Sequence, residues 1–325
     1  MISRRALLLA APALAGCASL GRFPFDGEPA AEGPGLHVRF FSVGCFLVRR
    51  GDVALLTDPF WSHLPLGRVA SGVVRSDPEA VAPVLPSLTT VRAVTVGHGH
   101  YDHVLGLPAA APHLASDARI FASQTVAHTF APEALPRPLE VVNPHAATER
   151  TPGRWLEAPG LRVLPIRSGH PDNIPGIHLF QRRLTEDRST RAERGHDYQE
   201  GETFAFLVDF LEGDEVAQRV YVQTSSRGFP DGFFPAELND RPVDLALLAM
   251  DCANIEARGG DSIIDFLQPR AVLFCHWGDF FRRKDRTPWE GVKVKLPWLK
   301  RRLPDTAQTR FLFPGWGSDF HFPGA

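Results

Sequence analysis

The feature that most constrains this sequence is a cluster of metal-ligand residue types, His98-Gly99-His100-Tyr101-Asp102-His103. The cluster comes directly after the apolar run 91–96, whose length and composition predict a buried strand. Alternate side chains of an extended chain point to the same side, so His98 and His100 can bind one ion together. A single histidine on an apolar face usually packs in a core, but three histidines and an aspartate within six residues predict a metal site.

Asp102 and His103 lie at the start of a helix predicted over 104 to about 114, which prolines interrupt. Their place at the end of the strand directs them toward the same point as His98 and His100. The sequence contains neither the H-E-x-x-H arrangement of zinc proteases nor a C-x-x-C pair. The cluster therefore predicts a metal site of another kind.

The remaining apolar runs predict one layered α/β domain over 36–325, which no change of composition divides. It opens with a hairpin whose strands are expected at 36–49 and 53–57. Further strands are predicted at 162–166, 203–210, 219–223, 243–250 and 271–275, with a helix at 261–267. The segment 181–202 is dense in charge and lacks an apolar period, which predicts a solvated insertion.

Three more motifs occur in an order that one family shares: Leu55-Leu56-Thr57-Asp58-Pro59, Ser168-Gly169-His170 and Phe274-Cys275-His276-Trp277-Gly278. With the H-x-H-x-D-H pattern at 98–103, they resemble the metallo-β-lactamase fold superfamily over nearly all of 36–276. The resemblance implies an α/β fold, the four-layer αββα sandwich of that family. It also implies a metal-dependent hydrolase.

The same resemblance implies the ligands of two metal ions. The first ion is expected to bind His98, His100 and His170, and the second Asp102, His103 and His276. Asp58 is expected to support the loop that carries the ligands. Zinc is the expected cofactor, as one or two ions, with iron or manganese as alternatives.

One position departs from the family pattern. The family's fourth motif supplies an aspartate that bridges the two metals, and Ser225 takes that place here. A neutral hydroxyl is a poor zinc ligand and cannot bridge as a carboxylate does. The all-histidine subclass of true metallo-β-lactamases also carries serine there and still binds two zinc ions. Asp251, after the predicted strand 243–250, is either a substitute carboxylate or part of an ordinary turn.

The chemistry expected of such a site is hydrolysis. A divalent metal on three neutral imidazoles lowers the pKa of bound water toward about 7 and makes hydroxide available. Asp102 is the predicted catalytic residue, because it can orient that hydroxide and accept its proton. No G-x-S-x-G nucleophile motif is present, which favours direct attack by water.

The substrate is constrained only by resemblance. The His-Tyr-Asp-His form of the signature resembles the branch that contains ascorbate-6-phosphate lactonase and N-acylphosphatidylethanolamine phospholipase D, which implies a phosphodiester, a lactone or a lipid-related ester. Ser225 favours the alternative of a true metallo-β-lactamase, although Ser168-Gly169-His170-Pro171 differs from the lactamase third motif. The missing aspartate favours a third alternative, a non-catalytic envelope lipoprotein that keeps the fold.

The N-terminus predicts export. A basic start, an apolar stretch and a small-residue cleavage site form a signal peptide over 1–16. The residues before Cys17 resemble a bacterial lipobox, which implies that Cys17 is acylated, and Ser3-Arg4-Arg5 resembles a twin-arginine signal. A plain secretory signal is the alternative. Residues 17–35 then form a flexible tether, and Ala18 implies the outer membrane, with the domain facing the periplasm.

Charge limits the partners that the sequence predicts. The formal net charge of −2 becomes about −4 without the two signal arginines, and neither value attracts nucleic acid or an anionic membrane. The expected partners are a small or lipid-like substrate and a membrane reached only through the lipid anchor. The basic clusters 282–284 and 300–302 predict a solvated face or a contact with anionic lipid. The sequence predicts no oligomeric state.

Three cysteines follow Cys17, namely Cys45, Cys252 and Cys275. An odd number leaves at least one thiol outside any disulfide. Each lies in an apolar stretch, so all three are expected to pack as small buried residues.

Overall fold

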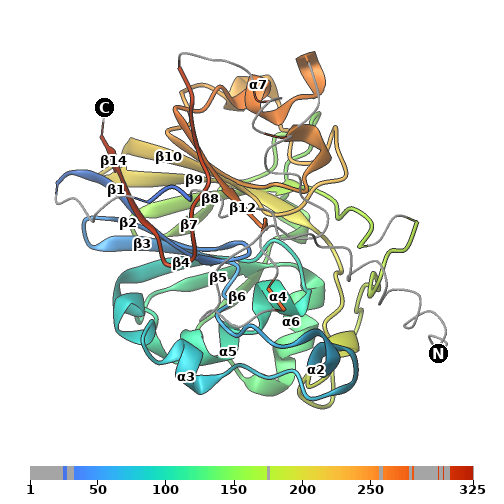
Figure 1. Cartoon of the computed structure of the whole chain (residues 1–325). Coiled ribbons are helices and arrows are strands. Elements are labelled where there is room, and N and C mark those ends of the chain that lie inside the picture. Colours follow the sequence, from blue (N-terminus) through green and yellow to red (C-terminus); the bar gives the residue numbers. More distant parts are fainter. Residues whose placement is uncertain are drawn as a thin grey trace.

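The computed structural model describes residues 25–27, 33–173, 176–255, 259–277, 280–281, 299, 303 and 308–324. These residues contain two seven-stranded mixed sheets, with helices on their outer sides (Figure 1). This is the αββα sandwich that the sequence predicts. The predicted signal, Cys17, most of the tether and both basic clusters lie outside the described residues. Among the described residues, no helix combines the length and the apolar character needed to cross a membrane.

The first sheet has the strand order β14-β1-β2-β3-β4-β5-β6. Its strands are β1 Gly35–Ser42, β2 Cys45–Arg50, β3 Val53–Thr57, β4 Val91–Thr95, β5 Arg119–Ala122, β6 Leu139–Val141 and β14 Asp319–Pro323. Strands β3 to β6 are parallel, while β14, β1, β2 and β3 pair antiparallel. The single strand predicted over 36–49 is wrong, because the chain turns at Val43, whose φ is +49°, and starts β2 two residues later.

The second sheet has the strand order β13-β12-β11-β10-β9-β8-β7. Its strands are β7 Leu156–Ala158, β8 Leu161–Arg167, β9 Phe204–Glu212, β10 Glu215–Gln223, β11 Leu245–Ala249, β12 Ala271–Cys275 and β13 Arg310–Leu312. Five of these strands are those predicted from the sequence, with ends that differ by a few residues. Strands β10 to β13 are parallel.

Alternation along the strands divides the core into two parts. In β3, Leu55 faces the core shared with the second sheet, whereas Ala54 and Leu56 face the helices on the outer side. Those helices are α2 Leu66–Ser71, α3 Pro78–Val81, α4 Tyr101–Val104, α5 Leu107–Ala110 and α6 Gln124–Phe130, with α7 Ile263–Leu267 on the opposite side of the sandwich (Figure 1). Short 3-10 turns are η1 Leu85–Thr90, η2 Ala111–His113, η3 Ala131–Glu133, η4 Asn143–His145, η5 Gly195–Asp197, η6 Ala236–Leu238, η7 Ala253–Ile255 and η8 Gly259–Asp261.

The helix predicted over 104 to about 114 is three short pieces instead of one. It is divided into the end of α4, then α5 and η2, and a proline lies in the first turn of each of the last two. Proline lacks an N–H and fixes φ, so it starts a new turn more readily than it continues an old one. Asp102 and His103 nevertheless lie in the first turn of a helix, as predicted.

The prediction that 181–202 is a solvated insertion holds for its first half only. Residues 181–191 are exposed or half-buried, but most of 192–202 is buried, including all of 198–202. The backbone explains the difference, because the Gly99 N–H donates to the Glu200 carbonyl at 2.9 Å. The second half of this segment therefore covers the loop that carries the histidines.

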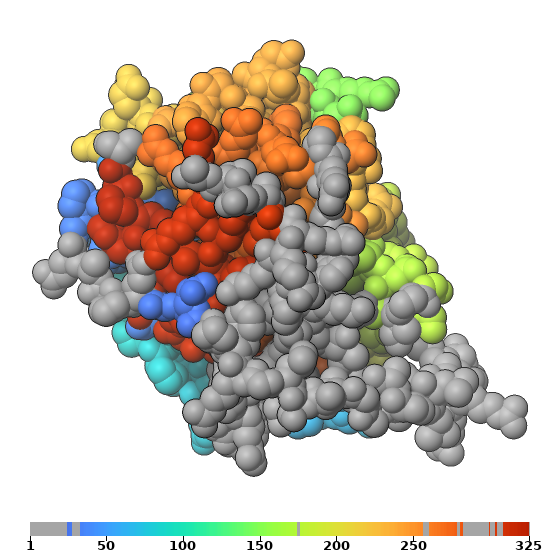
Figure 2. All heavy atoms as spheres, turned by 45° about the horizontal axis from the view of Figure 1, so that its top comes forward, coloured from blue at the N-terminus to red at the C-terminus, as the bar shows by residue number. Residues whose placement is uncertain are grey.

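The cysteines and the chain ends agree with simple packing. Cys45, Cys252 and Cys275 are buried, as expected, and none of these described cysteines forms a disulfide. At the other end of the chain, β14 pairs with β1, and Asp26 bridges to Pro314. Figure 2 shows blue N-terminal residues beside the red C-terminal ones on one face. The two ends of the described chain are thus joined at the edge of the sandwich.

Candidate metal centre

The candidate ligands lie just beyond the C-terminal ends of strands from both sheets. The 98–103 motif follows β4, His170 follows β8 and His276 follows β12. The two sheets meet at this end, because the Phe204 N–H at the start of β9 donates to the Gly97 carbonyl at 2.8 Å. Three loops that are distant in sequence therefore converge on one place.

The first predicted ligand set, His98, His100 and His170, is brought together with ligand atoms that lie within 4.8 Å of one another. His98 Nε2 lies 3.1 Å from His100 Nδ1. Two nitrogens bound tetrahedrally at about 2.0–2.1 Å lie roughly 3.3 Å apart, so this spacing fits a shared ion. His170 Nδ1 donates to the Pro171 carbonyl at 2.6 Å, which leaves its Nε2 available as a ligand.

Burial keeps these three imidazoles neutral. Desolvation and the neighbouring histidines hold the pKa of His98 well below its usual value. Desolvation and the proximity of His170 lower the pKa of His100 to about 3, and desolvation lowers the pKa of His170 to about 4. A neutral imidazole is the form that binds a metal, so the site is prepared for a cation at neutral pH.

The second predicted set, Asp102, His103 and His276, also converges within 4.8 Å. Asp102 Oδ2 lies 3.6 Å from His103 Nε2 and 3.5 Å from His276 Nε2. The buried His103 Nε2 has no hydrogen-bond partner in the part of the chain that the structure describes. An unsatisfied buried lone pair is costly, and a bound cation would satisfy it.

The electrostatics of the second set favour a positive charge. Burial opposes ionisation of Asp102, but the charges of His103 and His276 outweigh it and hold the pKa of Asp102 below its usual value. Burial also opposes protonation of His276, yet the carboxylates of Asp251 and Asp102 raise its pKa to about 9. A cation at this position would therefore meet a favourable field.

Asp58 supports the second set by contacting His103 at the ring nitrogen that is not a candidate ligand. Its Oδ2 lies 2.7 Å from His103 Nδ1, and its Oδ1 accepts the Gly97 N–H at 2.7 Å. The carboxylate is almost fully buried. A carboxylate on Nδ1 fixes the tautomer and turns Nε2 toward the ion, which is the supporting position predicted from the sequence. The turn at Gly44 makes room for it, because a Cβ there would lie 2.5 Å from Asp58 Oδ2.

Ser225 and Asp251 differ in their surroundings. Ser225 is buried just after β10, and its carbonyl accepts the Ser168 hydroxyl at 2.7 Å. Asp251 Oδ2, by contrast, lies 3.8 Å from His276 Nδ1. Asp251 therefore lies behind the His276 ring, on the side opposite Asp102, and is more than a surface turn.

Sequence reasoning missed His178 and Glu200. His178 Nε2 and Glu200 Oε2 form a short hydrogen bond, and the His178 ring stacks on His170 with centroids 5.5 Å apart. With His170 they form a third group of potential metal ligands within 4.8 Å. Burial raises the pKa of Glu200 despite the charge of His178. No motif surrounds either residue, so only the folded path of residues 176–202 brings them there.

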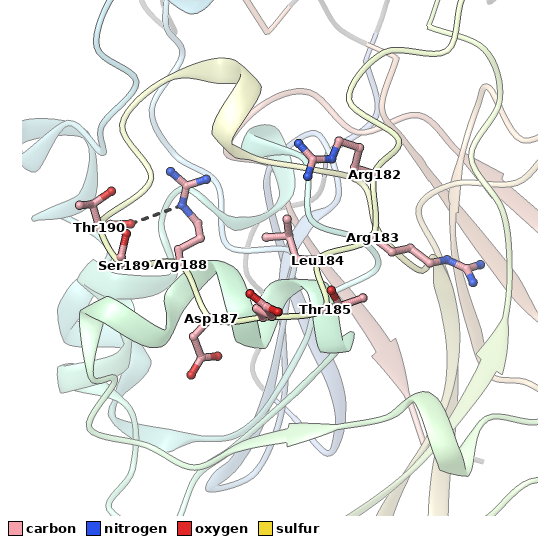
Figure 3. Close-up of a pocket in the computed structure, with 9 residues that line it drawn as sticks. Arg182, Arg183, Leu184, Thr185, Asp187, Arg188, Ser189 and Thr190 are labelled. Atoms are coloured by element: carbon pink, nitrogen blue, oxygen red, sulfur yellow. Dashed lines mark hydrogen bonds between the residues drawn. The ribbon is translucent and has the colours of Figure 1, made fainter.

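The other histidines without a motif stay apart from the centre. None of these described residues joins a potential metal-binding group: His37, His63, His113, His128, His145, His196 and His321. The first part of the insertion, residues 182–190, lines an open pocket of about 370 Å³ (Figure 3). Arg188 Nε closes one side by donating to the Thr190 carbonyl at 3.3 Å. This pocket contains none of the candidate ligands, so it is separate from the metal centre.

Comparison with known families agrees with this geometry. Residues 54–277 match a family model described as "Beta-lactamase superfamily domain", and the chain belongs to that family. The superfamily predicted from the motifs is thereby confirmed. A search of curated proteins gives no match.

Solved structures share the fold at low sequence identity. Isothiocyanate hydrolase from Delia radicum gut bacteria is 14% identical, with a TM-score of 0.52 over 89% of this chain and 100% of its own. A variant of the β-hydroxylase CmlA is 13% identical, with a TM-score of 0.51 over 90% of this chain and 55% of its own. CmlA is a diiron enzyme from Streptomyces venezuelae. At these identities the likeness extends to the fold alone.

Proposed function

We propose that this protein is a hydrolase that binds one or two divalent ions, most simply zinc, and cleaves a phosphodiester, a lactone or a lipid-related ester. The observation that carries the proposal is the convergence of two ligand sets, His98/His100/His170 and Asp102/His103/His276, at one end of the sandwich. Three imidazoles suit zinc, and the mixed carboxylate–imidazole set also suits iron or manganese.

The donor set fits the ion that the family implies. Such an ion supplies Lewis acidity, which makes water a competent nucleophile near neutral pH. Asp102 remains ionised next to His103 and His276, so it can orient a water molecule and accept its proton. Asp58 keeps His103 turned toward the centre. His178, beside His170, lies where it can contact a substrate that enters from the side of the insertion.

The substrate classes are supported by the resemblance of the signature and by the N-terminal sequence. Residues 1–17 favour a lipoprotein whose acylated Cys17 holds the domain at the outer membrane, where phosphodiesters and lipid esters are abundant. Replacement of Cys17 by serine tests the anchor. We expect the variant to leave the membrane fraction, and a variant that stays there would overturn it.

Metal content and turnover test the function directly. We would purify the full chain in detergent, measure zinc, iron and manganese by mass spectrometry, and assay a phosphodiester, a lactone, a carboxylic ester, an isothiocyanate and nitrocefin. We expect bound metal, and turnover of a phosphodiester, lactone or ester that His98→Ala abolishes and the exposed-histidine control His113→Ala leaves intact. Absence of metal after reconstitution would overturn the proposal, and turnover of nitrocefin alone would replace it with a lactamase.

A further inference from the structure

The second ligand set contains a single carboxylate, that of Asp102. Its other members, His103 and His276, are neutral when they bind a metal. Ser225 adds no charge at the end of β10. A cation held by one carboxylate and two imidazoles keeps a net positive charge in a buried place, which costs free energy unless other negative groups lie nearby. The carboxylate of Asp58 is such a group behind His103, and the His276 side needs one of its own.

The pairing of the strands places Asp251 beside the end of β10, where the carboxylate is missing. Strands β10 and β11 are parallel, with Gln223 opposite Leu248 at the end of the paired register, so the residues that follow the two strands leave the sheet side by side. The Ala253 N–H donates to the Ser226 carbonyl at 3.4 Å, so the two loops stay together beyond the strands. Asp251 thus lies one strand away from the position that Ser225 occupies.

The same register brings Asp251 to His276. Strands β11 and β12 are parallel, with Ala249 opposite Cys275, and the Met250 N–H donates to the Cys275 carbonyl at 2.9 Å. Asp251 therefore follows the central strand of three, between the end of β10 and the His276 loop.

The side chain of Asp251 lies behind the His276 ring. Its Oδ2 lies 3.8 Å from His276 Nδ1, while Asp102 lies 3.5 Å from Nε2 on the other side of the same ring. Its Oδ1 is buried and accepts no hydrogen bond from any residue that the structure describes. The carboxylate is thus desolvated at one oxygen and has a histidine ligand as its nearest partner, which a simple strand-end turn does not explain.

We propose that Asp251 supplies the negative charge that the end of β10 lacks, and that it stabilises the second cation by acting on His276. The inference rests on the proposed metal centre and adds to it a positioning residue that lies outside the family motifs. Asp251, at the end of β11, thus takes the role of the carboxylate that is missing at the end of β10, and it acts through the far side of the His276 ring.

Metal affinity tests this role without reference to turnover. We would titrate zinc into the full chain of wild type and of D251N, and follow both binding steps by calorimetry and by metal content after dialysis. Loss of an outer carboxylate typically costs 10–100-fold in metal affinity. We expect that loss in the second step only, with the first ion retained. D265N, which removes an exposed carboxylate on α7, is the matched control.

A second variant distinguishes charge from damage to the fold. S225D returns a carboxylate to the end of β10, so D251N should cost far less second-site affinity in that background than in wild type. An equal cost in both backgrounds, or D251N with wild-type affinity, would overturn the inference. Wild type that binds one ion per chain would overturn it as well, yet leave the hydrolase intact. Wild type that binds none would overturn the proposed function itself.

Discussion

Replacement of Asp58 by asparagine separates metal binding from folding at this centre. The carboxylate serves two buried donors, since Oδ2 faces His103 Nδ1 at 2.7 Å and Oδ1 accepts the Gly97 N–H at 2.7 Å. Asparagine keeps one acceptor for Gly97 but presents an N–H group to His103. The imidazole must then accept at Nδ1 and carry its proton on Nε2, which is the wrong tautomer for a ligand.

The expected loss in D58N is 10–100-fold in affinity for the second ion, or about 1.4–2.7 kcal/mol. D58A differs, because it leaves both donors unsatisfied. At about 1–3 kcal/mol for each buried donor, the free energy of unfolding should fall by about 2–6 kcal/mol. D58N should therefore lose affinity with little change of stability, and D58A should lose both.

Zinc titration followed by calorimetry gives the affinities, and urea unfolding of the metal-free protein gives the stabilities. D117N is a suitable control, because Asp117 is half-exposed and pairs only with Arg92 among the described residues. D58N that binds zinc as wild type does would refute the assignment of Asp58 as the residue that fixes the His103 tautomer. D58A as stable as wild type would refute its role in satisfying the buried donors.

Three further outcomes follow from the geometry. His178→Ala should leave the metal content unchanged but lower kcat/KM at least tenfold on a cleaved substrate, since its ring stacks on His170; loss of an ion would show instead that His178 is a ligand. Gly97→Ala should lower the melting temperature by several degrees, because its Cβ would clash with the Thr224 hydroxyl. The control Gly67→Ala should not, because its Cβ would have no atom within 4 Å, and equal melting temperatures of the two variants would contradict this packing. The pKa values of His100 and His170 are lowered in the fold from 6.5 to about 3 and about 4, so their contribution to stability is present above about pH 6.5 and lost as pH falls toward 4. The pKa of His276 is raised, so its contribution is lost as pH rises through about 9. Denaturant unfolding of the metal-free protein should therefore show maximum stability near pH 6.5, and a stability independent of pH would contradict this.

Local sequence pattern predicts a large part of this structure. The 98–103 motif after an apolar run predicts both the strand β4 and the metal ligands, because the side-chain alternation that aims His98 and His100 together is a property of a few neighbouring residues. Apolar runs likewise predict β3 and β8 to β12, since a buried strand needs only its own composition. The family motifs predict which distant loops meet.

Local sequence pattern fails where the conformation or burial of a residue depends on contacts with residues distant in the sequence. The prediction of one strand over 36–49 missed the turn at Val43. This turn is stabilised by a residue distant in sequence, since the His276 N–H donates to the Val43 carbonyl at 3.0 Å. Residues 192–202 carry charges typical of a solvated segment, yet most of them are buried, because their backbone bonds to the histidine loop.

By itself, the sequence predicted the fold family, the strands β3, β4 and β8 to β12, and the candidate ligands, because these follow from residue type, short spacing and motifs shared with a known family. Only the tertiary structure decided that Glu200 and His178 lie beside His170 and that Asp251 faces His276. These contacts depend on the register of β10, β11 and β12 and on the path of a long loop, and such long-range pairings leave no periodic trace in one chain.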